Sequence, residues 1–245
     1  MSEGAAPTFS PLAFRSAART DAGRVRPVNE DRYLERPQAG LWAVADGMGG
    51  HEDGEAAAAL VVETLGRLVD AGSAYANLRA LCASLKAANH ALAPGGEAAT
   101  RGSTVVALLL SDGHYACVWA GDSRCYRLRG KTFEQITRDH TLVQELVEAG
   151  ALTQDEARRH PRSHVVTRAV GARDEIELDV RHGPVEAGDL FLLCSDGLTS
   201  MVADGEIAEL IAARGVEAAG DLMTLALNRG ARDNVTVVLV AAEQA

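Results

Sequence analysis

Residues 104–129 read TVVALLLSDGHYACVWAGDSRCYRLR, and this stretch decides the fold class. Three strand-like runs, at 104–110, 114–120 and 124–129, are rich in apolar, β-branched and aromatic residues and are separated by the turn sequences SDG and GDS. Connections this short predict that the three strands are antiparallel neighbours.

The sequence around this stretch groups helices and strands without strict alternation. Apolar residues recur at helical spacing over 53–72, 74–93, 203–215 and 217–230, and further strand signals occur at 41–45, 189–197 and 234–242. This grouping indicates an α+β fold with helices packed on an antiparallel sheet or on a pair of sheets.

Residues 137–171 are polar and irregular, and we expect them to form an insertion beside the sheet. They contain a helical piece at 141–150 and a capping box formed by Thr153 and Glu156.

Composition favours one soluble domain. The chain has 245 residues, of which 47% are hydrophobic, and its formal charge of −10 opposes broad attraction to nucleic acid or anionic lipid. The N-terminal residues lack an export signal, and no apolar run approaches the roughly 18 residues of a membrane helix. We therefore expect a cytoplasmic protein with no membrane or nucleic-acid partner. The four cysteines form no CxxC pair, so we expect reduced structural thiols.

Carboxylates recur where apolar runs meet glycine. Asp46 and Gly47 follow LWAVA, Asp122 follows Gly121 at the end of YACVWA, and Asp196 precedes Gly197 at the end of LFLLCS. Asp233 stands just before the last strand, and Asn29-Glu30-Asp31 would add acid near the same edge. If these strands are neighbours, the acids converge, and oxygen ligands of this kind select Mg²⁺ or Mn²⁺.

These and other stretches can also be interpreted as turns, as a serine-hydrolase motif or as a zinc site. Any single Asp-Gly is more often a turn than a metal ligand, so the metal hypothesis depends on the joint occurrence. Ser123 and Ser195 lack the G-x-S-x-G frame of a serine hydrolase, and the spacing of His160 and His164 fits a solvated polar loop better than a zinc site.

Eight motifs in order carry a family resemblance: RVRPVNED (24–31), VADGMGGH (44–51), RGSTVVALLL (101–110), AGDSRCYRLR (120–129), ITRDHTLVQELVEAGALT (136–153), HVVTRAVG (164–171), LLCSDGLT (192–199) and RDNVTVVLV (232–240). Together they resemble bacterial metal-dependent protein phosphatases of the PPM family, also called type 2C. The resemblance implies a sandwich of two antiparallel sheets flanked by helices. It also implies an N-terminal tail over 1–14, one domain over 15–245 and a variable flap over about 137–171.

The resemblance also implies roles for individual residues. Asp46 matches the acid that bridges two metal ions, the Gly47 carbonyl matches a ligand of the first ion, and Asp196 and Asp233 match ligands of the second. Asp122 matches an acid that helps to hold a third, weaker ion together with Asp196. Asp31 would orient the attacking water, Arg26 would grip the substrate phosphate, and His51 is a candidate general acid: these three, Arg26, Asp31 and His51, are the predicted catalytic residues.

The implied reaction is the hydrolysis of phosphoserine and phosphothreonine in proteins, by in-line attack of a hydroxide that bridges two Mn²⁺ or Mg²⁺ ions. The expected partners are phosphorylated proteins and a serine/threonine kinase whose action the enzyme reverses. Two alternatives stay open: a hydrolase of small phosphate esters, and a catalytically silent regulator that binds phosphoproteins.

Overall fold

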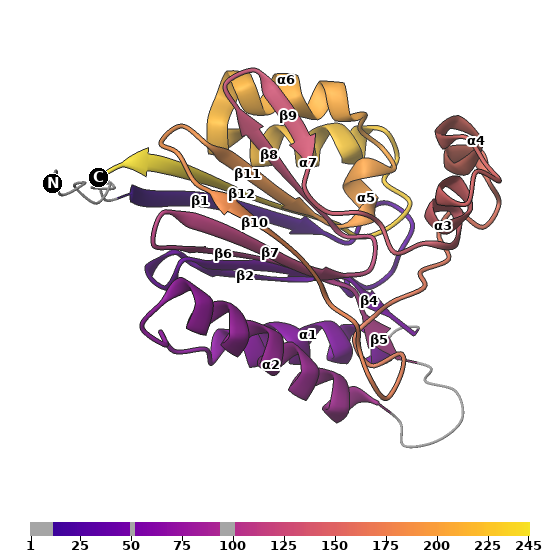
Figure 1. The fold of residues 1–245 in the computed structure, drawn as a ribbon. Helices are drawn as coiled ribbons and strands as arrows, with labels where there is room; N and C mark the ends of the chain where they lie inside the picture. The colour runs from indigo at the N-terminus through magenta and orange to yellow at the C-terminus, as the bar shows by residue number, and fades with distance from the viewer. Residues whose placement is uncertain (1–11, 50–51, 94–100) are drawn as a thin grey trace, which may run out of the picture.

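Two antiparallel five-stranded sheets lie face to face in the computed structural model, which describes residues 12–49, 52–93 and 101–245 (Figure 1). The first sheet has the order β1-β12-β11-β8-β9, with β1 (Leu12–Asp21), β12 (Val235–Gln244), β11 (Leu190–Cys194), β8 (Arg124–Arg129) and β9 (Thr132–Gln135). The second has the order β10-β7-β6-β3-β2, with β10 (Asp179–Pro184), β7 (His114–Ala120), β6 (Val105–Ser111), β3 (Leu41–Ala45) and β2 (Arg32–Arg36). The short strands β4 (Gly47–Met48) and β5 (Gly102–Ser103) form a separate pair.

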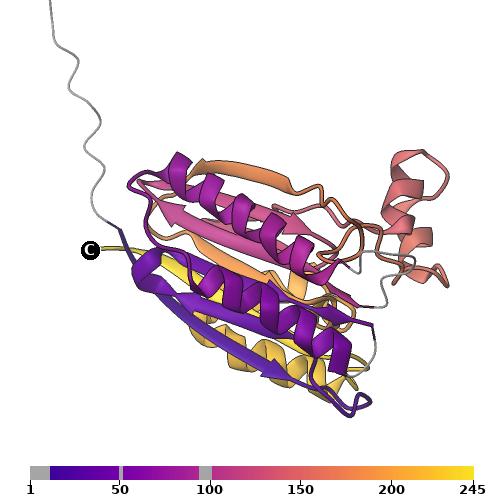
Figure 2. The ribbon, with the colours of Figure 1, turned by 90° about the horizontal axis from the view of Figure 1, so that it is seen from below.

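Helices cover the outer face of each sheet. Figure 2 shows α1 (Glu52–Gly66) and α2 (Ala74–Leu92) side by side on the second sheet, and α6 (Asp204–Arg214), η2 (Gly215–Glu217) and α7 (Ala218–Asn228) lie against the first. A third apolar cluster, which includes Trp42 and Phe191, fills the space between the sheets. Both faces of each sheet thus bury apolar side chains, and the predicted α+β sandwich flanked by helices is confirmed.

The predicted pairing of neighbouring strands holds in one place and is wrong in another. β6 and β7 are antiparallel neighbours, as expected. β7 and β8 are not, because β7 already pairs with β6 on one edge and with β10 on the other. The chain therefore crosses from the second sheet to the first at Gly121-Asp122-Ser123, and this crossing carries Asp122 to the end of the sandwich.

The N-terminal boundary and one helix end differ from the sequence pattern. β1 begins at Leu12, inside the segment expected to be a tail, and it pairs along its whole length with β12. α1 ends at Gly66 rather than near residue 72, because the amides of Arg67 and Leu68 bond three residues back and close the last turn.

The segment that precedes β10 forms a lobe beside the sheets, at the end where β3 and β11 finish (Figure 1). It contains α3 (Leu142–Glu148) and α4 (Gln154–Arg159), and the predicted capping box of Thr153 and Glu156 is present at the start of α4. Three further short elements are η1 (Pro37–Ala39), α5 (Asp196–Thr199) and the bridge between Thr141 and Val166. No helix in the described ranges has the length and apolar character needed to cross a membrane.

Candidate active site

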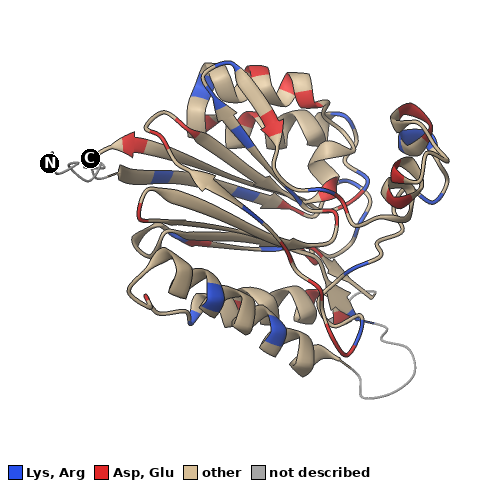
Figure 3. Cartoon of the chain, in the orientation of Figure 1, with Lys and Arg blue, Asp and Glu red and all other residues tan. Residues whose placement is uncertain are grey.

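One cavity of about 370 Å³ receives the ends of strands from both sheets. Asp46 follows β3, Asp122 follows β7, Asp196 follows β11 and Asp233 precedes β12, and all four line this cavity. β11 and β12 are neighbours in the first sheet, whereas β3 and β7 belong to the second. The acids therefore converge across the sandwich. The sequence pattern predicted instead that they converge because their strands are neighbours in one sheet. Figure 3 shows acidic positions at this end of the sheets.

Thr104 fixes the backbone that carries Asp46. Its amide donates to the Asp46 carbonyl at 2.9 Å, and its hydroxyl accepts from the Asp46 amide at 3.2 Å and pairs with the Ser123 hydroxyl at 2.7 Å. Gly47 follows at a point with no room for a side chain, since an added Cβ would lie 2.2 Å from the Gly54 carbonyl oxygen. Asp46 is thus held between two packed backbone segments.

Asp31 lies next to the cavity wall and is buried. One of its oxygens, Oδ2, accepts hydrogen bonds from Ser195 Oγ at 2.8 Å and from Thr236 Oγ1 at 2.7 Å. The other oxygen, Oδ1, is buried without a hydrogen-bond partner. Burial raises the pKa of Asp31 to about 7, although the two hydroxyls lower it.

Three aspartates that line the cavity, Asp46, Asp122 and Asp196, also have raised pKa values. Burial is the largest cause in each case, followed by repulsion from the neighbouring carboxylates. It places the pKa of Asp122 at about 8 and that of Asp196 at about 6, and it raises the pKa of Asp46 well above the ordinary value. A set of oxygen donors that repel one another is stabilised by a hard cation such as Mn²⁺ or Mg²⁺.

The donor set fits divalent cations by its chemistry, because the side chains that converge on the cavity are carboxylates, whose oxygens are the ligands that hard cations prefer. In residues 12–49, 52–93 and 101–245, no three His, Cys, Asp or Glu side chains are arranged so that they could already hold an ion. The carboxylates therefore surround the cavity and do not form a finished coordination sphere.

Arg26 is the cation nearest to Asp233 at the cavity. Its guanidinium donates to Asp233 Oδ2 at 2.8 Å, and this bond raises the pKa of Arg26 above its ordinary value. The loop that carries Arg26 is tied to the last strand by the buried Asn234. Asn234 Oδ1 accepts from the Glu30 amide at 2.8 Å, and Nδ2 donates to the carbonyls of Ala22 and Val28 at 3.0 and 2.9 Å.

The structure brings most of the predicted site residues to this cavity, namely Arg26, Asp46, Gly47, Asp122, Asp196 and Asp233. Asp31 stands beside it, and His51 lies outside the described residues. Their roles in binding and catalysis stay predictions.

Sequence reasoning missed several residues that build the cavity. Thr104, Asn234 and His164 line it together with Glu30, whose place near this edge was expected, and Ser195 and Thr236 orient Asp31. The assignment of His164 to a merely solvated loop was incomplete, because this exposed histidine also faces the cavity. The available signal was polar residues placed directly at the ends of buried apolar runs, as in CSDG and DNVT.

Residues 24–232 match the family described as Protein phosphatase 2C. The chain therefore belongs to the protein phosphatase 2C family, and the resemblance to bacterial PPM serine/threonine phosphatases is confirmed.

Named relatives and a solved structure are similar over most of the chain. It is 42% identical over 233 residues to the serine/threonine protein phosphatase PstP of Mycobacterium tuberculosis, a match that covers 93% of this chain and 45% of that protein. It thus spans about half the length of that relative. The serine/threonine phosphatase Stp of Listeria innocua is 33% identical over 235 residues, which cover 91% of this chain and 93% of that protein. A crystal structure of the catalytic domain of PstP in complex with two manganese ions has a TM-score of 0.82 and 40% identity, with 95% of this chain and 100% of that chain covered.

Proposed function

We propose that this chain hydrolyses phosphoserine and phosphothreonine in proteins with the help of bound Mn²⁺ or Mg²⁺. One observation carries the proposal. Four aspartates from the ends of strands in two sheets line a single cavity together with Arg26. Family membership and the names of the relatives agree with it, since those proteins are serine/threonine phosphatases and one catalytic domain was crystallised with two manganese ions.

The proposed metal ligands are the carboxylates that the fold places around the cavity. Asp46 would bridge two ions, the Gly47 carbonyl would complete the first position, and Asp196 and Asp233 would hold the second. Asp122, with Asp196, would hold a third and weaker ion. When bound, the cations would activate a water for in-line attack on phosphorus and offset the negative charge of the phosphate.

Arg26 and Asp31 would act directly on the substrate and the attacking water. The Arg26 guanidinium has a planar fork of donors that can bind two phosphate oxygens. Because the side chain is exposed and pairs with Asp233, it can exchange that contact for the phosphate. The unpaired Asp31 Oδ1 would accept a hydrogen bond from the attacking water and hold it in line, while Ser195 and Thr236 fix the other oxygen.

The leaving seryl or threonyl oxygen needs a proton, and His51 is the candidate donor from the sequence. The flap, residues 137–171, would contribute to substrate choice, and His164 and Val166 of this segment line the cavity. In the cell, the chain would reverse the action of a serine/threonine kinase in the cytoplasm.

The test compares turnover of phosphothreonine peptides with turnover of small phosphate metabolites in the presence of Mn²⁺. We expect peptide hydrolysis that disappears with a chelator and falls by orders of magnitude in Asp233→Asn at limiting Mn²⁺, because one charged ligand is lost. Glu186→Gln is the matched control, since Glu186 is an exposed acid away from the cavity.

Faster turnover of metabolites than of peptides would replace the proposed substrate class. Binding of phosphopeptides without any turnover would favour a silent regulator. Wild-type turnover in Asp233→Asn would remove Asp233 from the metal site.

A further inference from the structure

The first residues of the flap form hydrogen bonds with the residues on both sides of the loop that carries Asp122. Cys125 N–H donates to Thr137 Oγ1 at 3.1 Å, and Trp119 Nε1 donates to the Arg138 carbonyl at 2.8 Å. Asp139 accepts from Arg124, with the shortest bond at 2.6 Å. The connection between β7 and β8 is therefore enclosed by residues 137–140.

His140 makes the contact nearest to Asp122. Its backbone amide donates to the Gly121 carbonyl at 3.0 Å, and the Gly121 amide donates back to Nδ1 of the imidazole at 3.2 Å. The ring is 7% exposed and stacks on Trp119, with centroids 6.1 Å apart and an interplanar angle of 16°. A buried ring in this place has little freedom to rotate.

This reciprocal pair leaves the backbone before Asp122 little freedom to move. Gly121 has a φ of +117°, a conformation that glycine adopts far more easily than other residues. A Cβ at Gly121 would lie 2.5 Å from Thr104 Cβ, so Thr104 closes the other side of the loop. Because Thr104 also holds the Asp46 backbone, His140 and Thr104 together fix the spacing between Asp46 and Asp122.

The same histidine touches the returning end of the flap and the strand that follows it. The Thr167 amide donates to the His140 carbonyl at 2.8 Å. Nε2 lies 3.3 Å from Asp179 Oδ2 without a well-aligned hydrogen bond, and Arg168 donates to Asp179 Oδ1 at 3.0 Å. Both ends of the flap thus meet at His140.

We propose that His140 is a positioning residue, which holds the Gly121 amide through Nδ1 and so sets the place of the Asp122 carboxylate. Through this contact, the position of the flap is linked to the ion that Asp122 and Asp196 would hold. The inference rests on the proposed function, in which Asp122 is a ligand of the weakest ion.

Two amide substitutions separate the nitrogens of the ring. In His140→Asn, the side-chain oxygen can occupy the place of Nδ1 and accept from Gly121. In His140→Gln, the amide reaches the place of Nε2, near Asp179, and the Gly121 amide loses its partner. Removing an outer partner of a metal ligand commonly weakens metal binding 10- to 100-fold.

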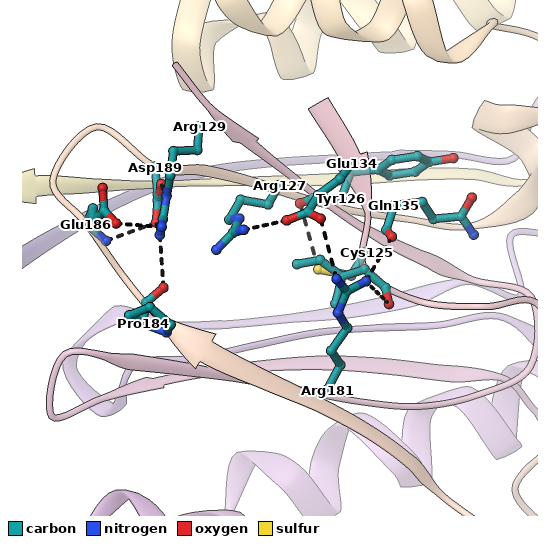
Figure 4. A network of polar contacts seen from close by, with 11 residues as sticks. Cys125, Tyr126, Arg127, Arg129, Glu134, Gln135, Arg181, Pro184, Glu186 and Asp189 are labelled. Carbon is teal, nitrogen blue, oxygen red and sulfur yellow. Dashed lines mark hydrogen bonds and ion pairs between the residues drawn. The ribbon is translucent and has the colours of Figure 1, made fainter. Parts of the chain in front are cut away.

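Arg181→Met is the matched control. Figure 4 shows Arg181 of β10 beside Glu134 of β9, and its guanidinium lies 3.4 Å from Glu134 Oε2 and 3.5 Å from the Gln135 and Ile136 carbonyls. This contact joins the segments that precede and follow the flap, but no contact of Arg181 reaches Gly121 among those found in the described residues. Arg181→Met therefore measures how Mn²⁺ affinity changes when a contact beside the flap is lost and the contact with Gly121 is kept.

The experiment is calorimetric titration of the metal-free protein with Mn²⁺, together with peptide turnover as a function of Mn²⁺ concentration. We expect the weakest Mn²⁺ site to lose about 10-fold in affinity in His140→Gln, with less than about 3-fold loss in His140→Asn and in Arg181→Met. Circular dichroism checks that each variant folds. If His140→Gln does not fold, His140→Phe, which keeps the stacking on Trp119 and lacks both nitrogens, takes its place.

Equal losses in the Asn and Gln variants, wild-type affinity in His140→Gln, or an equal loss in Arg181→Met would each overturn the role of His140. Asp122→Asn separates this failure from a failure of the proposed function. If Asp122→Asn loses the weak site and His140→Gln keeps it, only the role of His140 is wrong. If Asp122→Asn keeps every Mn²⁺ site, the assignment of Asp122 is wrong and the inference falls with it.

Discussion

Burial of the Asp31 carboxyl lowers the free energy of unfolding of the metal-free protein at neutral pH. Its pKa is raised from 3.8 to about 7, with burial as the largest cause. Between these two values the folded state binds more protons than the unfolded state, so the free energy of unfolding falls as pH rises from about 4 to about 7. About three pKa units correspond to about 4 kcal/mol at most, and more than half of this develops between about pH 5 and pH 8.

Asp31→Asn should remove this cost. The amide oxygen can accept from Ser195 and Thr236 as Oδ2 does, and the amide nitrogen can replace the unpaired Oδ1 without adding negative charge. We expect the metal-free variant to exceed the metal-free wild type in unfolding free energy by about 2–4 kcal/mol at pH 8 and by less at pH 5. Catalytic turnover with Mn²⁺ should fall, because the oxygen that would orient the attacking water is gone.

Urea unfolding in the presence of a chelator, at pH 5 and pH 8, measures the unfolding free energies of the variant and of the wild type. Asp189→Asn is the matched control, because Asp189 is also buried but pairs with Arg129 at 2.6 Å. That variant should be destabilised at both pH values, since it leaves Arg129 without its buried partner. An Asp31→Asn variant with the same pH dependence as the wild type would refute the explanation of its raised pKa.

Three further predictions concern the phosphate, the proton donor and the end of β11. Arg26→Ala should raise KM for phosphopeptides and lower kcat/KM at saturating Mn²⁺, and steady-state kinetics equal to wild type would return Arg26 to a surface role. His51→Ala should slow phosphothreonine peptides much more than p-nitrophenyl phosphate at saturating Mn²⁺, because a phenolate leaves without help from an acid; equal losses would remove His51 from the catalytic residues. Gly197→Ala should lower the unfolding free energy by about 3 kcal/mol in urea titrations, since its Cβ would lie 1.9 Å from the Asn234 carbonyl oxygen. The control Gly205→Ala, with nothing within 4 Å of its Cβ, should be neutral or stabilising, and equal losses in both variants would argue against the clash.

Secondary structure was predicted correctly from the sequence where residues close together in the chain determine it. The strands at 114–120 and 124–129 and the capping box at Thr153 were predicted with their observed bounds or partners. β1 was missed because only Ala18 in it is buried and because its partner strand β12 lies more than two hundred residues away. The family motifs named the candidate ligands before any geometry was known, since the acids stand at fixed places beside glycine.

Residues 104–129 determined by themselves that the protein would contain short buried strands joined by tight turns. They could not determine which sheet each strand joins, because pairing depends on free edges elsewhere in the fold. β7 has β6 and β10 on its two edges, so β8 pairs with β11 and β9, and Asp122 stands where the chain crosses between the sheets. The same holds for the cavity: the sequence supplied the carboxylates, but only the stacking of two sheets brought Asp46 and Asp122 to face Asp196 and Asp233, and only that stacking buried the partners of Asp31.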